Sequence, residues 1–204
     1  EDQVAYRDGT RLVARLYPSA RSGGRIPARM RPDGAYLVTG GLGALGRLVL
    51  VALAERGAGH LIVTSRSGLP PRAEWDALTD DAQRDAVAAV RAAEASGASV
   101  QVVAVDVTDA RALTETLARL HAAGVPALRG VIHSAAVLDD ELVVGLTRES
   151  MERIWAPKAL GAWRLHEAAA GKDLDFWVGF SSVASLLGSP GQSAYAAANA
   201  WLDA

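Results

Sequence analysis

Residues 35–46, AYLVTGGLGALG, join a short apolar run to a glycine-rich turn that opens into a helical pattern. Residues 35–39 predict a buried strand, and residues 44–57 predict the helix that follows it. Glycines at 41, 43 and 46 allow a tight turn, close approach of backbone to a pyrophosphate, and close packing of helix on sheet. The N-terminus of the helix also offers free N–H groups to phosphate. The stretch predicts a dinucleotide-binding turn, with a purely structural glycine turn as the alternative.

The pattern continues outward from this turn as alternating strands and helices. Short apolar segments separated by longer helical ones predict parallel strands joined by right-handed crossovers. The fold class is therefore α/β, a Rossmann-like doubly wound parallel sheet with helices on both faces. Further strands are expected near 60–65, 99–106, 128–135 and 174–182, and further helices near 73–96, 109–123, 147–170 and 191–204.

The chain divides into two unequal parts. Residues 1–34 hold an amphipathic strand-like segment, Arg11–Tyr17, and a polar linker, Pro18–Gly34. This part is too short to form a domain, and it is expected to be the tail of something upstream. Residues 35–204 form the nucleotide-binding part.

Composition excludes several classes of protein. The 204 residues include no cysteine, so disulfides, thiolate metal sites and a cysteine nucleophile are excluded. The four histidines lack metal-ligand spacing, and a net charge of −2 without a basic stripe gives no reason to expect a nucleic-acid partner. The longest apolar stretch, Leu48–Ala54, is too short to span a membrane. Without a secretory signal, the chain is expected to be cytoplasmic, with neither metal nor membrane contact.

Residues after the second, third and fourth strands extend the predicted cofactor site. The second strand ends at Ser65-Arg66, where NAD-binding folds usually carry an acidic residue. A guanidinium suits a 2′-phosphate, so NADPH is favoured over NADH, with a solvated arginine as the alternative. Asp106 is expected to bond the adenine amino group. The predicted cofactor contacts from these four strand ends are Thr39, Gly40, Gly41, Gly43, Leu45, Gly46, Ser65, Arg66, Asp106, Val107, His133, Ser134 and Ala135.

A second group of residues carries the predicted chemistry. Ser182 follows the last strand, and Tyr195 and Asn199 are four residues apart on the last helix, so they share one face. A serine and a phenol at one sheet edge can hold a carbonyl oxygen from two sides. Lys158 lies on the helix 147–170 beside Pro157, which predicts a kink or a break in hydrogen bonding there. The alternatives are a buried serine, a core tyrosine, a capping asparagine and an exposed lysine.

These motifs resemble the short-chain dehydrogenase/reductase superfamily. The glycine turn 39–46, the Ser182–Tyr195 spacing and the strand–helix order carry that resemblance. The superfamily usually has lysine four residues after its tyrosine; here Asn199 stands there, with Lys158 on the preceding long helix. This exchange is similar to the ketoreductase domains of modular polyketide synthases, as are residues 131–140, 158–162 and 188–192. Residues 1–4 and 14–16 resemble the last strand of that family's N-terminal structural subdomain.

The resemblance implies a reaction and its partners. NADPH would reduce the β-keto group of an acyl chain held as a thioester on an acyl carrier protein, beside the other domains of a multifunctional synthase. In the family's mechanism Tyr195 donates a proton and Ser182 a hydrogen bond, while Asn199 orders water. Lys158 holds the nicotinamide ribose, and both Lys158 and Tyr195 contact the cofactor. The family's catalytic part continues to two more strands and a lid, so the part 35–204 is expected to be truncated before them.

The resemblance also predicts stereochemistry. Leu138-Asp139-Asp140 matches a motif of B-type ketoreductases, which give a D-configured hydroxyl; a solvated loop is the alternative reading. Leu187 stands where A-type members have tryptophan, and Ala197, in place of proline, favours a non-epimerised α-substituent. Gln192 completes the predicted substrate contacts. Two other functions stay open: a catalytically silent scaffold or cofactor-binding module of a synthase, and a reductase of free ketones.

Overall fold

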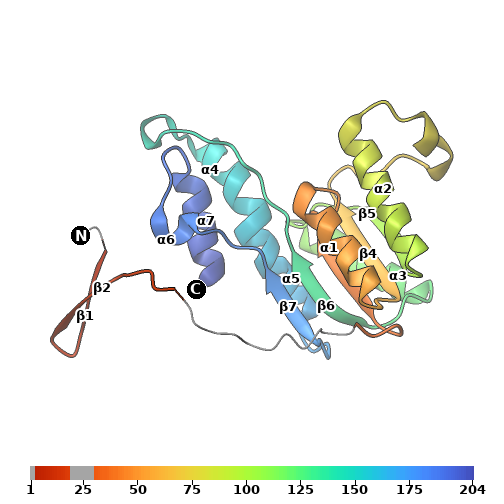
Figure 1. The fold of residues 1–204 in the computed structure, drawn as a ribbon, viewed down its shortest axis with the longest axis horizontal. Coiled ribbons are helices and arrows are strands. Elements are labelled where there is room, and N and C mark those ends of the chain that lie inside the picture. Colours follow the sequence, from red (N-terminus) through yellow and green to blue (C-terminus); the bar gives the residue numbers. More distant parts are fainter. Residues whose placement is uncertain (1–2, 19–29) are drawn as a thin grey trace.

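The computed structural model describes residues 3–18 and 30–204, and a five-stranded sheet lies at its centre (Figure 1). The strand order is β5-β4-β3-β6-β7, and all four pairings are parallel. The strands are β3 (Ala35–Thr39), β4 (His60–Ser65), β5 (Ser99–Ala104), β6 (Leu128–His133) and β7 (Phe176–Gly179). Their carboxyl ends, and the loops that follow them, share one edge of the sheet.

Helices connect the strands and cover both faces of the sheet, which confirms the doubly wound fold. The helices are α1 (Ala44–Glu55), α2 (Asp81–Ala95), α3 (Ala110–Ala122), α4 (Arg148–Trp155), α5 (Gly161–Ala169), α6 (Ala184–Leu187) and α7 (Ser193–Asp203). Two short 3₁₀ turns, η1 (Arg72–Ala77) and η2 (Val143–Gly145), and a π-helical segment, η3 (Ala156–Leu160), complete the order. None of the helices built from the described residues is long and apolar enough to cross a membrane.

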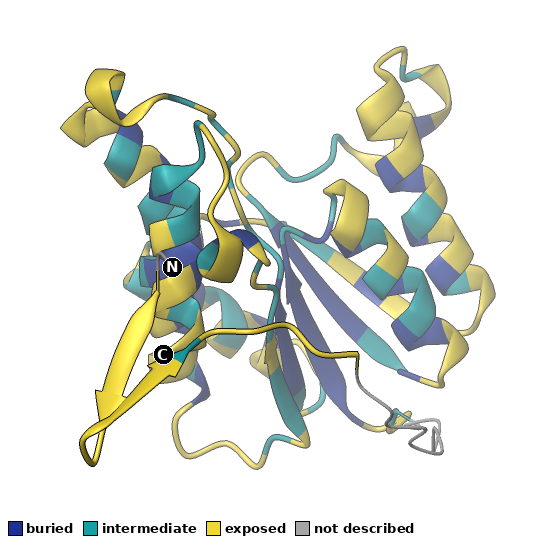
Figure 2. Ribbon diagram, turned by 60° about the vertical axis from the view of Figure 1, so that its left-hand side comes forward, coloured by how far each residue is buried: buried dark blue, intermediate teal, exposed yellow. Residues whose placement is uncertain are grey.

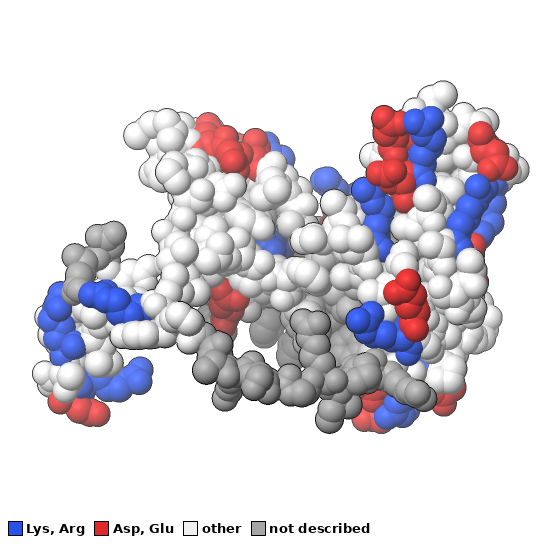
Figure 3. Space-filling view, in the orientation of Figure 1, with Lys and Arg blue, Asp and Glu red and all other residues white. Residues whose placement is uncertain are grey.

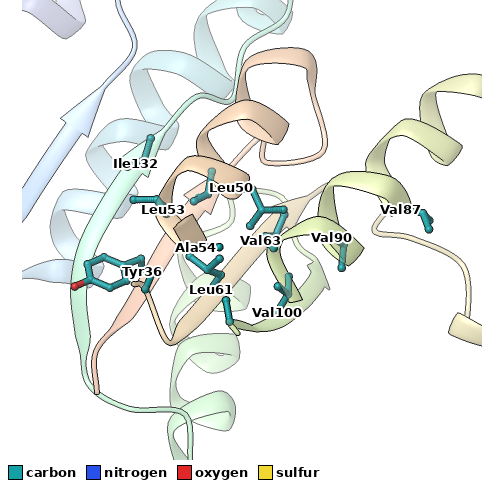
Figure 4. Close-up of a cluster of buried hydrophobic side chains, with 14 of the residues drawn as sticks. Tyr36, Leu50, Leu53, Ala54, Leu61, Val63, Val87, Val90, Val100 and Ile132 are labelled. Atoms are coloured by element: carbon teal, nitrogen blue, oxygen red, sulfur yellow. The ribbon is translucent and has the colours of Figure 1, made fainter. Parts of the chain in front are cut away.

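Two hydrophobic clusters hold the helices on the sheet. Side chains alternate across a strand, so β3 sends Tyr36 and Val38 into one cluster and Leu37 into the other. The first cluster includes Leu50 of α1 and Val90 of α2 (Figure 4). The second contains residues of α3 and α5. Every residue of β3 is buried, which makes it the central strand that positions the glycine turn.

The strand expected at 174–182 is shorter and less buried than predicted. β7 ends at Gly179, so Ser182 lies three residues beyond it, on the loop before α6. None of its four residues is fully buried, because within the described residues β7 has β6 as its neighbour on one side alone.

Two expected helices are interrupted. The helix predicted over 73–96 is instead η1 followed by α2, because Asp80 caps α2 by accepting a hydrogen bond from the Gln83 N–H. The helix predicted over 147–170 begins at a capping box formed by Thr147 and Ser150. It continues through the π-helical segment that contains Pro157. The predicted break in hydrogen bonding therefore takes the form of a widened turn.

The N-terminal part forms a hairpin rather than a single strand. β1 (Val4–Arg7) pairs antiparallel with β2 (Thr10–Val13) across a turn in which Asp8 and Gly9 both have positive φ. The hairpin is exposed along nearly its whole length (Figure 2). A two-stranded hairpin is marginal alone in water. Most of the predicted linker Pro18–Gly34, and the first two residues of the chain, lie outside the described residues.

Candidate active site

The glycine turn after β3 packs too tightly for side chains at two positions. Gly40 has a φ of +64°, and a Cβ there would lie 2.8 Å from the Cα of Ala135. A Cβ on Gly46 would lie 2.3 Å from the carbonyl oxygen of Gly40. Close packing of α1 against the turn therefore requires glycine, as the sequence predicted for Gly46.

A groove of about 270 Å³ runs along the carboxyl edge from this turn. Nine of the predicted cofactor residues line it: Thr39, Gly40, Gly43, Ser65, Arg66, Asp106, Val107, Ser134 and Ala135. Pro157 of the π-helical segment closes one side. Gly41 packs against Val63 behind the turn, and the side chain of Leu45 is exposed on α1. The groove thus gathers residues that follow four different strands.

The polar groups of the groove suit an anionic ligand. α1 has Gly43 as its N-cap, with no side-chain cap and no acidic residue in its first turn, so its first N–H groups are available to phosphate. Arg66 is exposed in the groove and has no ion-pair partner within residues 3–18 and 30–204. Asp106, which also lines the groove, accepts hydrogen bonds from the backbone N–H and the hydroxyl of Thr108. The residues present therefore fit a phosphorylated dinucleotide.

Lys158 is buried in the π-helical segment, with 3% of the residue exposed. Its ammonium donates to the carbonyl oxygen of Phe180 at 2.6 Å and lies 5.5 Å from the centre of the Tyr195 ring. Burial lowers the pKa of Lys158, and the negative charge of Asp203 opposes that shift. A buried ammonium beside a phenol is unusual and costs stability. The predicted exposed-lysine alternative is wrong, because the side chain points inward.

Tyr195 and Asn199 share one face of α7, as their spacing predicted. The Asn199 side chain donates to the carbonyl oxygen of Tyr195 at 2.7 Å and is fully buried. Its Oδ1 finds no hydrogen-bond partner in the described part of the chain. Ser182 lies just before α6, and α6 packs against α7. The Ser182 hydroxyl oxygen accepts a hydrogen bond from the Ala184 N–H at 3.2 Å.

His133 does not line the groove, although it ends β6 beside Ser134 and Ala135. The residue is 1% exposed, with Nδ1 2.7 Å from the Thr39 hydroxyl and Nε2 3.0 Å from the Lys158 carbonyl oxygen. Burial lowers its pKa from 6.5 to about 4, so the ring is neutral at pH 7. Both ring nitrogens are engaged within the protein, which leaves neither for a cofactor.

Three of the predicted stereocontrol residues, Leu138, Asp139 and Asp140, lie on the loop after β6, and Leu187 and Gln192 lie at α6 and at the start of α7. Asp139 forms an ion pair with Arg153 of α4, and Asp140 accepts a hydrogen bond from Gln192 at 3.1 Å. Leu138 and Leu187 are both mostly exposed. Asp139 and Asp140 each contact another element, but Asp140 is exposed and Asp139 is half-buried, so the solvated-loop alternative stays open. Arg153 was missed from the sequence, because no spacing links it to a loop fourteen residues earlier.

Around α2, basic and acidic side chains lie next to one another. Arginines on and around α2 pair with acidic residues, as Arg72 does with Glu94 and Arg91 with Asp76. In Figure 3, blue and red side chains lie side by side over α2. Among the residues that the structure describes, no group of three or more histidine, aspartate or glutamate side chains could hold a metal ion.

Comparison with known proteins places this geometry in a family. The model of the KR domain matches residues 34–204. The chain belongs to the KR domain family. This KR domain is 36% identical to the ketoreductase from the first module of phoslactomycin biosynthesis in Streptomyces sp. HK803, with a TM-score of 0.79 over 100% of this chain and 44% of that one. It is 39% identical to an A1-type ketoreductase, with a TM-score of 0.78 over 100% of this chain and 40% of that one.

Curated relatives are much longer than this chain. The KR domain is 43% identical to 6-methylsalicylic acid synthase of Aspergillus terreus over 100% of this chain and 12% of that protein. The chain thus spans about an eighth of the length of this relative. Family membership confirms the resemblance to polyketide-synthase ketoreductases. Ketoreductases of this family are oxidoreductases that act on keto groups, and KR domains use a nicotinamide cofactor.

Proposed function

We propose that the chain carries the NADPH-dependent reduction of a β-keto group on an acyl thioester, held by an acyl carrier protein, to a β-hydroxyl. One observation carries this proposal. A buried ammonium, Lys158, lies 5.5 Å from the centre of the Tyr195 ring, and its neighbour Pro157 lines the groove that suits a dinucleotide phosphate. Burying a charge costs free energy, and groups whose pKa is shifted by burial cluster at functional sites. Bound NADPH would supply the hydride.

The chain's own residues have separate roles in this proposal. Tyr195 donates its proton to the carbonyl oxygen as negative charge develops there, and the Ser182 hydroxyl donates a hydrogen bond to the same oxygen. The Lys158 ammonium has three N–H donors, of which one is used by Phe180, so others remain for a ribose. Its charge also favours release of the phenolic proton. The unpartnered Oδ1 of Asn199 would accept a hydrogen bond from a bound water, and that water would return the proton to Tyr195.

The preference for NADPH rests on Arg66. Arg66 lines the groove directly after β4, and no acidic side chain from the end of that strand is present to bind ribose hydroxyls. A guanidinium offers two parallel N–H donors to a phosphate and cannot be deprotonated at neutral pH. These properties favour a 2′-phosphorylated cofactor. The remaining groove residues, including Gly43, Ser65, Val107 and Ser134, would hold the rest of the nucleotide.

B-type stereochemistry, which gives the D-configured hydroxyl, rests on a local motif. Overall likeness does not decide it, because the similar structures include an A1-type ketoreductase. Leu138-Asp139-Asp140 and the absence of tryptophan at 187 support the B type. Gln192 holds Asp140 from the turn before α7, so the motif is fixed relative to Tyr195. The proposed partners are the other domains of a synthase. Residues 1–34 are proposed to be the tail of a structural subdomain. The proposed location is the cytoplasm.

Two alternatives are separated by one assay on the full-length protein. NADPH oxidation is followed with a β-ketoacyl thioester, with a free ketone of the same acyl chain, and with the Tyr195→Phe variant in parallel. The proposal expects turnover of the thioester and loss of turnover in the variant. Turnover of the free ketone alone would favour a general reductase. Cofactor binding without any turnover would favour a silent scaffold.

A further inference from the structure

His133 occupies a position from which it contacts three parts of the site. It is the last residue of β6, and its buried ring lies between the end of β3 and the π-helical segment. A carbonyl oxygen accepts hydrogen bonds and cannot donate, so the Nε2 that faces the Lys158 carbonyl must carry the ring proton. Nδ1 is then the acceptor, and the Thr39 hydroxyl donates to it. The neighbours of the ring therefore fix one neutral tautomer.

The π-helical segment η3 packs closely against the His133 ring. The Lys158 carbonyl lies in the π-helical segment, where Gly161 N–H bonds to Ala156, five residues back. Gly161 also faces the imidazole, and a Cβ on it would lie 3.3 Å from His133 Cε1 and 2.7 Å from Val107. A side chain at 161 would push the helix away from the ring. The glycine therefore lets the backbone of Lys158 approach β6.

A closed circuit of hydrogen bonds links His133, Phe180 and Lys158. The carbonyl oxygen of His133 accepts from the Phe180 N–H at 3.0 Å. The carbonyl oxygen of Phe180 accepts from the Lys158 ammonium at 2.6 Å. The Lys158 carbonyl in turn accepts from the His133 ring at 3.0 Å. His133 thus fixes the backbone of the lysine directly, and it fixes the carbonyl that holds the ammonium.

We propose that His133 is a positioning residue for the reaction, which sets the place of the Lys158 ammonium relative to Tyr195 through its Nε2–H bond to the Lys158 carbonyl. This inference rests on the proposed function. It replaces the sequence-based expectation of a cofactor contact for the His133 side chain. A displacement of about 1 Å at a reacting group costs on the order of 100-fold in rate, so loss of this bond is expected to act mainly on kcat.

Two amide variants in the full-length protein test the role of Nε2. The amide nitrogen of glutamine can reach the position of Nε2, whereas that of asparagine reaches only the position of Nδ1. We expect His133→Gln to keep most of the wild-type kcat. His133→Asn should lose about 100-fold in kcat, with little change in the KM for the thioester. Equal losses in the two variants, or full activity in His133→Asn, would overturn the inference.

A measurement without turnover separates this inference from the proposed function. ¹⁵N NMR of the wild-type imidazole is expected to show the neutral Nε2–H tautomer at pH 7. An Nδ1–H tautomer or a charged ring would contradict the inference, even if both variants fail to fold. Conversely, a protein with the expected tautomer that reduces no β-ketoacyl thioester would refute the proposed function and leave the hydrogen-bonded circuit intact.

Discussion

The cofactor half of the molecule, β3 to β6 with α1 to α3, differs from the catalytic half, β7 with α4 to α7. In the cofactor half, all five residues of β3 are buried, and the two hydrophobic clusters draw most of their members from it. In the catalytic half, β7 has no fully buried residue, α6 is a single turn, and Leu187 is exposed. The first half provides a rigid frame, and the second carries reactive side chains on short or irregular elements.

The residues that stabilise the fold and the residues predicted to carry the reaction therefore lie mainly in different halves of the molecule. The groove of the first half is formed by tightly packed glycines and by strand ends, so its shape depends on the packing of the buried strands and helices. The predicted catalytic set depends on individual side chains, one of which, Lys158, is buried at a cost. Substitution of a core side chain in the first half should therefore reduce stability, whereas substitution of a catalytic side chain in the second half should reduce turnover.

The largest effect is expected from Lys158→Met. Removing the ammonium should lower kcat by roughly 10²–10⁴-fold, because proton transfer by Tyr195 loses its charged neighbour. The free energy of unfolding should stay the same or rise, since burial lowers the pKa of this lysine and the folded state disfavours its charge. Steady-state kinetics and urea unfolding of one preparation measure both quantities. A variant that unfolds easily yet keeps its kcat would break the comparison.

The reverse signature is expected from Leu50→Ala. Leu50 is fully buried between α1 and the sheet, so the truncation should cost about 2–5 kcal/mol in the free energy of unfolding. Leu187→Ala is the matched control, because the same side chain is mostly exposed on α6. Its cost should be within about 0.5 kcal/mol. Equal costs at the two positions would show that the halves do not differ in packing.

Stability should fall in acid because of His133. Its pKa is lowered from 6.5 to about 4 in the folded state, so the unfolded chain binds the proton more readily. The neutral ring therefore contributes stability that is fully present above pH 6.5 and is lost as the pH falls to about 4. The loss is on the order of 3 kcal/mol. Urea unfolding across this pH range should show a shallower fall in His133→Gln, and parallel curves would contradict the assignment.

Cofactor choice should change with Arg66→Ser. Loss of a charge-assisted hydrogen-bond donor costs about 1.5–3 kcal/mol, which is about 10–100-fold in the ratio of kcat/KM for NADPH to that for NADH. The value for NADH should change little, because NADH lacks the 2′-phosphate. Arg47→Ser, on α1 and paired with Asp85, is a control that should leave the ratio unchanged. A fall of equal size for both cofactors would assign Arg66 to general phosphate binding.

The smallest effect on rate is expected from Asp140→Ala. Asp140 holds Gln192 beside the N-terminus of α7, and its loss should lower the D:L ratio of the product with little change in kcat. Gln192→Ala should act in the same direction, since it removes the other partner. Chiral chromatography of the product measures the ratio. An unchanged ratio in both variants would remove this contact from stereocontrol.

The sequence predicts regular features well because they repeat. Strand β3, the glycine turn and helix α1 follow from apolar periodicity and glycine spacing, and their bounds lie close to those expected. The hairpin β1–β2 was missed although Asp8-Gly9 is a strong signal for a two-residue turn. The division of 73–96 was also readable, since Asp80 followed by Gln83 marks the start of a helix.

The arrangement around Lys158 could not be read in the same way. The sequence shows that Pro157 disturbs the helix, but not that the disturbance is a π-helical turn that faces the lysine inward. The partners of Lys158 are the backbone carbonyl of Phe180 and the ring of His133, which are distant in sequence. Backbone carbonyls carry no residue-type signal. Such contacts are set by how β6, β7 and the helix pack.

The central claim is most directly tested by the fate of the transferred hydride. The full-length protein is incubated with NADPH deuterated at the transferable position and a β-ketoacyl chain on its acyl carrier protein, and the chain is analysed by mass spectrometry. The account predicts one deuterium at the β-carbon with wild type and none with Tyr195→Phe, although both bind NADPH. Binding of the cofactor without deuterium in the wild-type product would contradict it.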